Sequence, residues 1–380
     1  MKKVFAIVLA AMMVVGMFAG CAAQPAASSG VIKVGTSGPL TGGYAVYGMG
    51  VAQGLELAFS EINAMGGLQF ELKSEDDEAG VDTAVNAYNA LMDWGMQIMA
   101  GPTTSGSAGA VAAECANDKV FMLTPSASDA SVIAAGSNIF QICFSDPNQG
   151  KASADYIYNN KLGTSVGVIY DSSSPYSTGI YNTFKAQAEA IGLNIGTVES
   201  FTEDSKADLT TQVTKCKEAG CDLVFLPLYT AENAQVLTCA DKIGYDVAFF
   251  GCDGMDGILA VEGFDTKLAE GALLLTPFDA TSSDNKTQNF VKNYTEKYGV
   301  APNQFAADAY DVGYAIYEAC KASGVTADMS ATEICDKMVQ WFTTNSFDGI
   351  TGSGMTWGAD GAVSKYPMAV VIENGVYVTP

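Results

Sequence analysis

The chain has 380 residues, with 19 Lys or Arg, 42 Asp or Glu and no His, which gives a formal net charge of -23 at pH 7. All 19 basic residues are lysines. A chain this acidic repels phosphate backbones and anionic lipid headgroups, which excludes nucleic-acid binding and polybasic docking to membranes. Without histidine there is no Ser-His-Asp or Cys-His nucleophile and no imidazole-bound metal, so we expect no enzyme activity, metal or cofactor.

The chain begins with a pattern typical of an export signal. Two lysines precede the apolar run 4–18, and Ala19-Gly20 leads into Cys21. A charged start, a short apolar run and a small-residue cleavage site define a secretory signal. The segment resembles the bacterial lipoprotein signal, whose cysteine receives a lipid before the preceding peptide is removed, although Phe18 departs from the usual Leu, Val or Ile. An ordinary cleaved signal or an uncleaved anchor is the alternative.

We therefore predict a signal peptide over 1–20, lipid attachment at Cys21 and a location on the outer face of the cell membrane. Residues 22–30 contain only Ala, Ser, Pro, Gly and Gln. This composition is typical of a flexible linker. We expect a tether over 21–30 and a folded body from Val31 onward, whose roughly 350 residues favour two domains.

The eight cysteines other than Cys21 contain no C-x-x-C pair, so zinc and thioredoxin-like motifs are absent. Cys216 and Cys221 are the closest in sequence and could pair in an exported protein. Most of the eight lie in apolar runs, where a buried free thiol behaves as a small hydrophobic group. We favour free thiols.

From Val31 onward, short apolar strands alternate with amphipathic helices. The strand 31–36 is followed by the helix 50–64, whose apolar residues share one face. Runs that are apolar on both faces and alternate with helices predict parallel sheets covered on both sides. The alternation restarts near residue 165, so we expect an α/β fold of two doubly wound, Rossmann-like lobes. Further strands are expected at 68–73, 96–100, 119–124, 165–171, 224–228, 247–251 and 272–276, and further helices at 81–92, 107–117, 178–190, 208–219 and 231–243.

Loops rich in hydroxyls and small residues follow several of these strands. They are 37–48, 101–107 and 124–128, after the first, third and fourth strands. Ligands of doubly wound sheets bind where such loops converge. Hydroxyls, backbone N–H groups and helix starts can hold an anion, and a chain without arginine would have to bind a carboxylate in this way. Taken singly, each Ser or Thr also fits a helix cap.

Four segments resemble the branched-chain (leucine/isoleucine/valine) amino-acid-binding proteins, which have the type I periplasmic binding fold. They are Ser-Gly-Pro at 37–39, Glu-Ile-Asn-Ala-Met-Gly-Gly at 61–67, Asp-Pro-Asn-Gln-Gly at 146–150 and Phe-Phe-Gly-Cys-Asp-Gly at 249–254. The resemblance covers nearly all of 31–378. It implies two lobes, joined by three hinge strands, that close on a ligand for delivery to an ABC permease. The implied lobes are 31–146 plus 278–354 and 147–277 plus 355–380.

The resemblance also implies which residues bind the ligand. It places an aromatic cap at Tyr47, carboxylate-binding hydroxyls at Ser105 and Ser128, and acids for the α-amino group at Asp146 and Asp253. An ammonium group needs charged acceptors, whereas neutral donors at helix starts can satisfy a carboxylate. Glu is frequent in the family where Asp253 stands, which leaves the preferred amino acid open. Further candidates are Thr103, Thr104 and Ser126 through backbone contacts, the clamping aromatics Tyr176 and Tyr229, and Tyr310.

Taken singly, the two acids also fit turn caps, and the tyrosines also fit packing positions. The expected function is that of a monomeric extracytoplasmic solute-binding lipoprotein of an ABC importer. Its partners would be an amino acid with an apolar or aromatic side chain, an ABC permease and, through Cys21, the membrane. The alternatives are a sensory ligand-binding module and a binder of a non-amino-acid carboxylate or amide.

Overall fold

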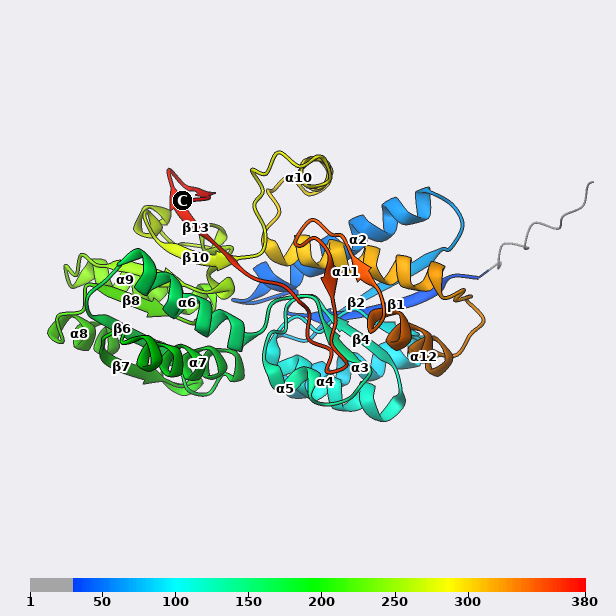
Figure 1. Ribbon diagram of the computed structural model, residues 1–380, viewed down its shortest axis with the longest axis horizontal. Helices are drawn as coiled ribbons and strands as arrows, with labels where there is room; N and C mark the ends of the chain where they lie inside the picture. Colours follow the sequence, from blue (N-terminus) through cyan, green and yellow to red (C-terminus); the bar gives the residue numbers. More distant parts are fainter. Residues whose placement is uncertain (1–29) are drawn as a thin grey trace, which may run out of the picture.

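The computed structural model describes residues 30–380 and shows two α/β lobes lying side by side (Figure 1). The predicted signal peptide, the lipidation of Cys21 and nearly all of the predicted tether lie outside the described residues. Within 30–380, no helix is both long and apolar enough to cross a membrane. The eight cysteines of this part of the chain are buried and unpaired.

The N-terminal lobe contains a five-stranded sheet in the order β2-β1-β3-β4-β5, and all its strand pairs are parallel. Successive residues of a strand point to opposite faces, so strands that are apolar throughout need helices on both sides. Helices α2, α11 and α12 cover one face, and α3, α4 and α5 cover the other. The strands are β1 (Ile32–Gly38), β2 (Phe70–Asp76), β3 (Ile98–Met99), β4 (Phe121–Thr124) and β5 (Ile139–Gln141). The helices are α2 (Ala45–Ala64), α3 (Val81–Trp94), α4 (Ser105–Asp118), α5 (Ala130–Ile133), α10 (Asn285–Tyr298), α11 (Gln304–Ala322) and α12 (Ala331–Phe342).

The C-terminal lobe contains a seven-stranded sheet in the order β14-β13-β10-β9-β8-β6-β7. Five strands are parallel, while β13 and β14 extend the sheet beyond β10 as antiparallel strands. Helices α6 and α7 pack on one face, and α8 and α9 on the other. The strands are β6 (Val166–Asp171), β7 (Ile195–Phe201), β8 (Leu223–Leu226), β9 (Ala248–Gly251), β10 (Leu273–Thr276), β13 (Met368–Glu373) and β14 (Val376–Val378). The helices are α6 (Asp146–Asn160), α7 (Pro175–Ile191), α8 (Thr210–Glu218) and α9 (Thr230–Lys242), with short 3-10 turns that include η2 (Asp253–Met255).

These two lobes confirm the predicted fold class of two doubly wound sheets. The chain passes between the lobes after β5, after β10 and before β13 (Figure 1). The sequence-based boundary of the third crossing, residue 354, falls inside the N-terminal lobe. Trp357 and Val363 pack in that lobe's core, and the Trp357 indole Nε1 donates to the carbonyl of Gln141 at 2.8 Å. The small hairpin β11 (Ser346–Phe347) and β12 (Met355–Thr356) precedes them, so the third crossing is 364–367.

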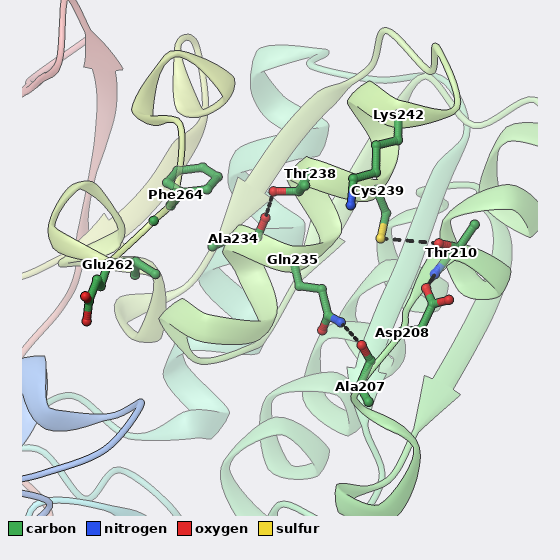
Figure 2. Close-up of a pocket in the computed structure, with 12 residues that line it drawn as sticks. Ala207, Asp208, Thr210, Ala234, Gln235, Thr238, Cys239, Lys242, Glu262 and Phe264 are labelled. Carbon is green, nitrogen blue, oxygen red and sulfur yellow. Dashed lines mark hydrogen bonds between the residues drawn. The ribbon is translucent and has the colours of Figure 1, made fainter.

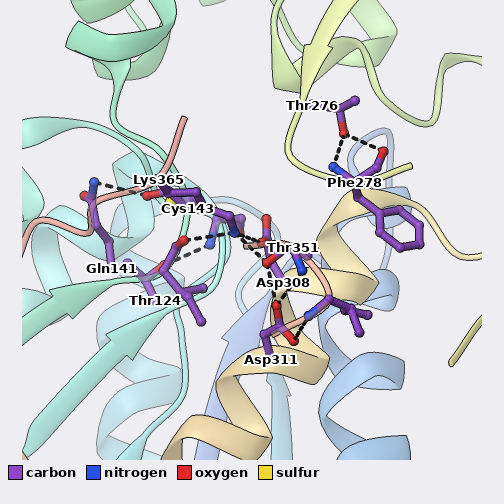
Figure 3. Close-up of polar contacts among 12 residues, drawn as sticks. Thr124, Gln141, Cys143, Thr276, Phe278, Asp308, Asp311, Thr351 and Lys365 are labelled. Atoms are coloured by element: carbon purple, nitrogen blue, oxygen red, sulfur yellow. Dashed lines mark hydrogen bonds and ion pairs between the residues drawn. The ribbon is translucent and has the colours of Figure 1, made fainter. Parts of the chain in front are cut away.

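A buried lysine joins two of the crossings to the N-terminal lobe (Figure 3). Lys365 lies in the third crossing, and its Nζ donates to the carbonyl of Ile142 in the first crossing at 3.1 Å. The same ammonium pairs with Asp308 of α11 and donates to the Thr351 hydroxyl at 2.6 Å. Asp311, one turn further along α11, accepts the Thr351 hydroxyl and backbone N–H. Two crossings are thereby held against α11.

Candidate functional site

An enclosed cavity of about 10 Å³ lies between the two lobes. This volume is roughly that of one water molecule, so the lobes are closed on each other. Parallel strands direct the loops at their carboxyl ends toward a common edge, and the lining residues come largely from such loops. The N-terminal lobe contributes Tyr47, Thr103, Thr104, Ser126 and Phe305, and the C-terminal lobe contributes Tyr176, Tyr229, Asp253 and Gly254.

Tyr47 connects the two lobes directly. Its hydroxyl donates to the carbonyl of Gly254 at 2.6 Å and accepts from the backbone N–H of Thr230 at 2.6 Å. The ring is buried, and it lies against Tyr229 of the other lobe with 5.4 Å between ring centroids. Because these partners belong to the C-terminal lobe, the contacts require the closed arrangement.

Aromatic rings form much of the cavity wall. Tyr176 and Tyr229 stack with their centroids 4.7 Å apart and an interplanar angle of 7°. Phe305, at the start of α11, meets Tyr47 edge-on at 4.7 Å. The three tyrosines Tyr47, Tyr176 and Tyr229, which the family resemblance implied, therefore converge on one cavity with Phe305, which the sequence reasoning missed.

Tyr310, the site residue that the family resemblance implied on α11, does not line the cavity. Its hydroxyl donates to Oε2 of Glu61 at 2.6 Å, and its ring lies 4.7 Å from that of Phe290. Residues five apart on a helix point about 140° away from each other, so Phe305 and Tyr310 face different surroundings. Phe305 was missed because the sequence analysis did not predict helix α11, at whose start it lies.

Two of the predicted hydroxyls are buried without a hydrogen-bond partner among the described residues. They are Thr104 Oγ1, at the N-terminal cap of α4, and Ser128 Oγ, just before α5. A buried polar group without a partner is costly, so such groups in a native structure commonly mark a ligand contact. Thr104 is among the residues that line the cavity, whereas Ser128 and Asp146 are not.

The other predicted hydroxyls hold the loops together. Ser105 Oγ accepts from the backbone N–H groups of residues 128 and 129, both at 3.2 Å. The Ser126 hydroxyl donates to the carbonyl of Thr103 at 2.6 Å, and the Thr103 hydroxyl donates to the carbonyl of Ser37 at 3.2 Å. These bonds join the loops after β1, β3 and β4 into one rigid unit.

Asp146, the first residue of α6, is completely buried, and neither of its carboxylate oxygens has a hydrogen-bond partner among residues 30–380. Burial raises the pKa of Asp146 well above its usual 3.8, the nearby Ser128 hydroxyl acts in the opposite direction, and the charge of Asp253 raises the pKa further. Helix α7 lies close by, because a Cβ placed on Gly179 would be 3.1 Å from Asp146 Oδ2. A buried, unpaired carboxylate calls for a cationic partner.

Asp253 lies in the turn η2, just after β9, and accepts the Tyr176 hydroxyl on Oδ1 at 2.7 Å. Burial raises the pKa of Asp253 to about 7, although the bond from Tyr176 acts in the opposite direction. Gln149 accepts the backbone N–H of Asp253 on Oε1 at 3.1 Å, and its Nε2 has no partner in the described part of the chain. Gln149 was not predicted as a site residue, although it follows Asp146 by one helical turn in the 146–150 segment.

A larger depression lies on the C-terminal lobe (Figure 2), where about 440 Å³ is bounded by residues including Thr210 of α8, Gln235 of α9 and the loop 261–264. Its polar side chains bond to neighbouring backbone: Gln235 Nε2 donates to the carbonyl of Ala207 at 2.6 Å, and Thr238 Oγ1 to that of Ala234 at 2.7 Å. None of the predicted ligand-binding residues lines it. The cavity between the lobes is therefore the candidate site.

Two α/β lobes joined by three crossings, with a polar and aromatic cavity at their interface, define a binding protein that closes on a small ligand. A sequence model of the periplasmic binding protein family matches residues 31–375, and the chain belongs to this family. The family is made up of substrate-binding proteins and not of enzymes, and its members work outside the cytoplasm.

Several known proteins are similar to this chain. The Leu/Ile/Val-binding protein homolog 3 of Brucella melitensis is 29% identical over 306 residues, covering 79% of this chain and 81% of the relative. The branched-chain amino acid transporter substrate-binding protein LivJ of Streptococcus pneumoniae, solved with isoleucine, is 27% identical with a TM-score of 0.82, and the match covers 92% of this chain and 100% of LivJ. A solute-binding protein of an ABC transporter from R. palustris, solved with benzoate, shares the fold with a TM-score of 0.80 at 20% identity, covering 92% of this chain and 95% of that one.

Proposed function

We propose that this protein is the extracytoplasmic substrate-binding component of an ABC importer and that it binds an α-amino acid with an apolar or aromatic side chain. The observation that carries the proposal is the buried carboxylate of Asp146, which has no hydrogen-bond partner among residues 30–380. An uncompensated buried charge is strongly unfavourable, and a ligand ammonium group removes that cost. The relatives named for leucine, isoleucine and valine support the same ligand class.

In this proposal, Asp146 and Asp253 hold the α-amino group of the ligand. Thr104 and Ser128 donate to the α-carboxylate, which lies near the N-terminal end of α4, where the helix dipole favours an anion. The side chain packs against the aromatic wall of Tyr47, Tyr176, Tyr229 and Phe305. Ser105 acts by holding the loop after β4 in position instead of binding the ligand directly.

Binding works through closure of the two lobes. A ligand stabilises the closed state only to the extent that it binds that state more tightly than the open one. Asp253 belongs to the C-terminal lobe, and Thr104 and Ser128 belong to the N-terminal lobe, so a ligand must lie between the lobes to satisfy both of its ends. The cavity of about 10 Å³ must widen to admit an amino acid, so the ligand-bound lobes are slightly further apart than in this structure. The closed form then presents both lobes to the permease.

We further propose that Cys21 carries a lipid, that residues 21–30 form a tether and that the protein is a monomer. Lipid attachment keeps the binding protein at high local concentration beside its permease. The wild type should partition into the detergent phase after extraction with a phase-separating detergent, whereas Cys21→Ala should not be cleaved at this position or acquire label from a radioactive fatty acid. Incorporation of label into Cys21→Ala would contradict the assignment.

Thermal unfolding in the presence of single candidate ligands tests the binding function. Leucine, isoleucine, valine and phenylalanine at millimolar concentration should raise the melting temperature, because a ligand that binds only the folded state stabilises it by mass action. Benzoate and simple amides form the second arm, motivated by the benzoate complex on the same fold. A shift with benzoate and none with any α-amino acid would replace the proposed ligand by an aromatic carboxylate.

A further inference from the structure

A polar cluster joins the lobes outside the ligand cavity. It consists of Tyr44, Lys206 and Glu232, and none of the three lines the cavity. We propose that this cluster, called here the rim latch, holds the lobes closed and so sets how long a ligand remains bound without contacting it. The inference rests on the proposed binding by lobe closure, but it concerns different residues.

The geometry of the rim latch makes it specific to the closed state. Tyr44 caps the start of α2 in the N-terminal lobe, and its hydroxyl donates to Oε1 of Glu232 in the first turn of α9 at 2.6 Å. Lys206, also of the C-terminal lobe, donates to the Tyr44 hydroxyl at 3.0 Å. Tyr44 is therefore the only one of the three that the N-terminal lobe supplies, and opening of the lobes breaks both of its bonds.

Charge and shielding make these bonds stronger than ordinary surface contacts. The Glu232 side chain is 6% exposed and the Lys206 side chain is 28% exposed, and their charged atoms are 3.4 Å apart. The Lys206 ammonium lies 5.1 Å from the centre of the Tyr44 ring and also pairs with Glu203 at 2.8 Å. Hydrogen bonds to charged, partly buried groups contribute more than neutral or fully exposed ones.

Glu232 gives the rim latch its selectivity between the two states. Its second oxygen, Oε2, is buried without a hydrogen-bond partner among the described residues. In the closed state, loss of the Tyr44 hydroxyl would leave this carboxylate with Lys206 as its remaining partner. In the open state, water reaches the Glu232 carboxylate, so loss of the Tyr44 hydroxyl changes the free energy of that state little. Removal of one oxygen atom from Tyr44 should therefore shift the equilibrium toward the open form.

The expected consequence is kinetic. A ligand enters the open form, whose rim contacts are already broken, and leaves only after the closed form opens. Weakening the rim latch should therefore raise the dissociation rate, and it should raise the association rate only in proportion to the added fraction of open unliganded protein. The ring of Tyr44, 5.3 Å from that of Tyr229 at the cavity wall, remains in the variant Tyr44→Phe.

Single-molecule energy transfer between the lobes tests the proposal. Dyes are attached through Met65→Cys and Tyr158→Cys, which replace exposed residues of different lobes, 57% and 47% exposed respectively. Closed-state dwell times are recorded without ligand and with leucine. Tyr44→Phe should shorten the closed dwell about tenfold in both conditions and change the closing rate of the open state little.

Matched control variants distinguish the loss of the rim latch from a general loss of stability. Tyr181→Phe removes a hydroxyl on α7, away from the rim, and should leave the dwell times unchanged. Glu232→Gln should also shorten the closed dwell. The double variant Tyr44→Phe/Glu232→Gln should shorten it by less than the two single effects combined, because both substitutions remove the same hydrogen bond. The melting temperature of unliganded Tyr44→Phe should match that of the wild type.

An unchanged closed dwell in Tyr44→Phe, with or without leucine, would overturn the rim latch. Failure of every amino acid to lengthen the closed dwell of the wild type would instead overturn the proposed ligand class. In that case the dwell times without ligand still decide whether Tyr44 holds the lobes together.

Discussion

The Tyr176 hydroxyl donates to Oδ1 of Asp253 at 2.7 Å and accepts the backbone N–H of Gly254 at 2.9 Å. One side chain of α7 therefore orients both the acid proposed to bind the ligand ammonium and the turn that carries this acid. The ring of Tyr176 also stacks on Tyr229. Tyr176 thus joins the polar and aromatic parts of the cavity.

Tyr176→Phe should weaken leucine binding about 10- to 100-fold, since it removes a hydrogen bond to a buried charged group and leaves the N–H of Gly254 without its partner. The ring and its stacking remain, so the fold should be preserved. Titration calorimetry measures the change. Tyr170→Phe, a hydroxyl deletion at the end of β6 outside the cavity, is the control and should bind normally. Wild-type affinity in Tyr176→Phe would mean that Asp253 needs no orientation from α7.

Ligand affinity should depend on pH through Asp253 and Asp146, because burial raises the pKa of both acids. Burial raises the pKa of Asp253 from 3.8 to about 7, so the unliganded protein holds a proton there below neutral pH. An ammonium ligand needs the carboxylate, and affinity for leucine should therefore fall by up to about tenfold per pH unit as the pH drops below about 7. Calorimetry at pH 6 in buffers of different ionisation enthalpy should detect proton release on binding. A flat affinity profile across this range would contradict the assignment.

The stability of the unliganded protein should follow the opposite trend. A carboxyl whose pKa is higher in the folded than in the unfolded state binds more protons when folded, so its contribution to the free energy of unfolding decreases as the pH rises from about 4 to about 7. Urea unfolding of the wild type and of Asp253→Asn isolates this contribution. The difference between the two should change with pH inside this window and become constant above it.

Asp146→Asn should separate stability from binding. The neutral amide replaces a buried carboxyl group that has no hydrogen-bond partner among residues 30–380 and whose ionisation burial disfavours, so the melting temperature of the unliganded protein should stay the same or rise. Leucine affinity should fall about 100-fold, because the ligand ammonium loses a charged acceptor. Asp208→Asn, which changes the net charge equally at an exposed position, is the control. Intact binding in Asp146→Asn would move the site elsewhere.

Lys365→Met should destabilise the protein by about 3–5 kcal/mol, since it leaves the buried carboxylate of Asp308 without its cation. The change is measured by urea unfolding monitored through tryptophan fluorescence. Lys292→Met, at a side chain that is 68% exposed, should change stability by less than about 0.5 kcal/mol. Adding Asp308→Asn to Lys365→Met should recover part of the lost stability. If Lys365→Met alone lost as little stability as Lys292→Met, the crossings would not depend on the pair of Lys365 and Asp308.

Much of the strand and helix pattern could be predicted from local hydrophobicity. The expected strand 247–251 is β9 (Ala248–Gly251), and the expected helix 81–92 lies within α3 (Val81–Trp94). Helix α11 was not predicted, because it packs against α2, α10 and α12 and is buried on several sides, so it carries no single apolar stripe. The antiparallel strands β13 and β14 were also missed, since they follow a crossing instead of a helix.

By itself, the sequence predicted the two-lobed α/β class, because the alternation of apolar strands with amphipathic helices is a local property of the chain, and its resemblance to the branched-chain amino-acid-binding proteins implied Tyr47, Asp146 and Asp253 as site residues. Only the tertiary structure decided which groups are free to bind. Ser105 accepts two N–H groups from a loop more than twenty residues away, whereas the hydroxyl of the adjacent Thr104 has no hydrogen-bond partner in the part of the chain that the structure describes. The rim latch likewise joins Tyr44 to Glu232 across 188 positions of sequence. Whether a buried polar group has a hydrogen-bond partner depends on atoms that distant segments bring to it, and local sequence patterns do not identify those atoms.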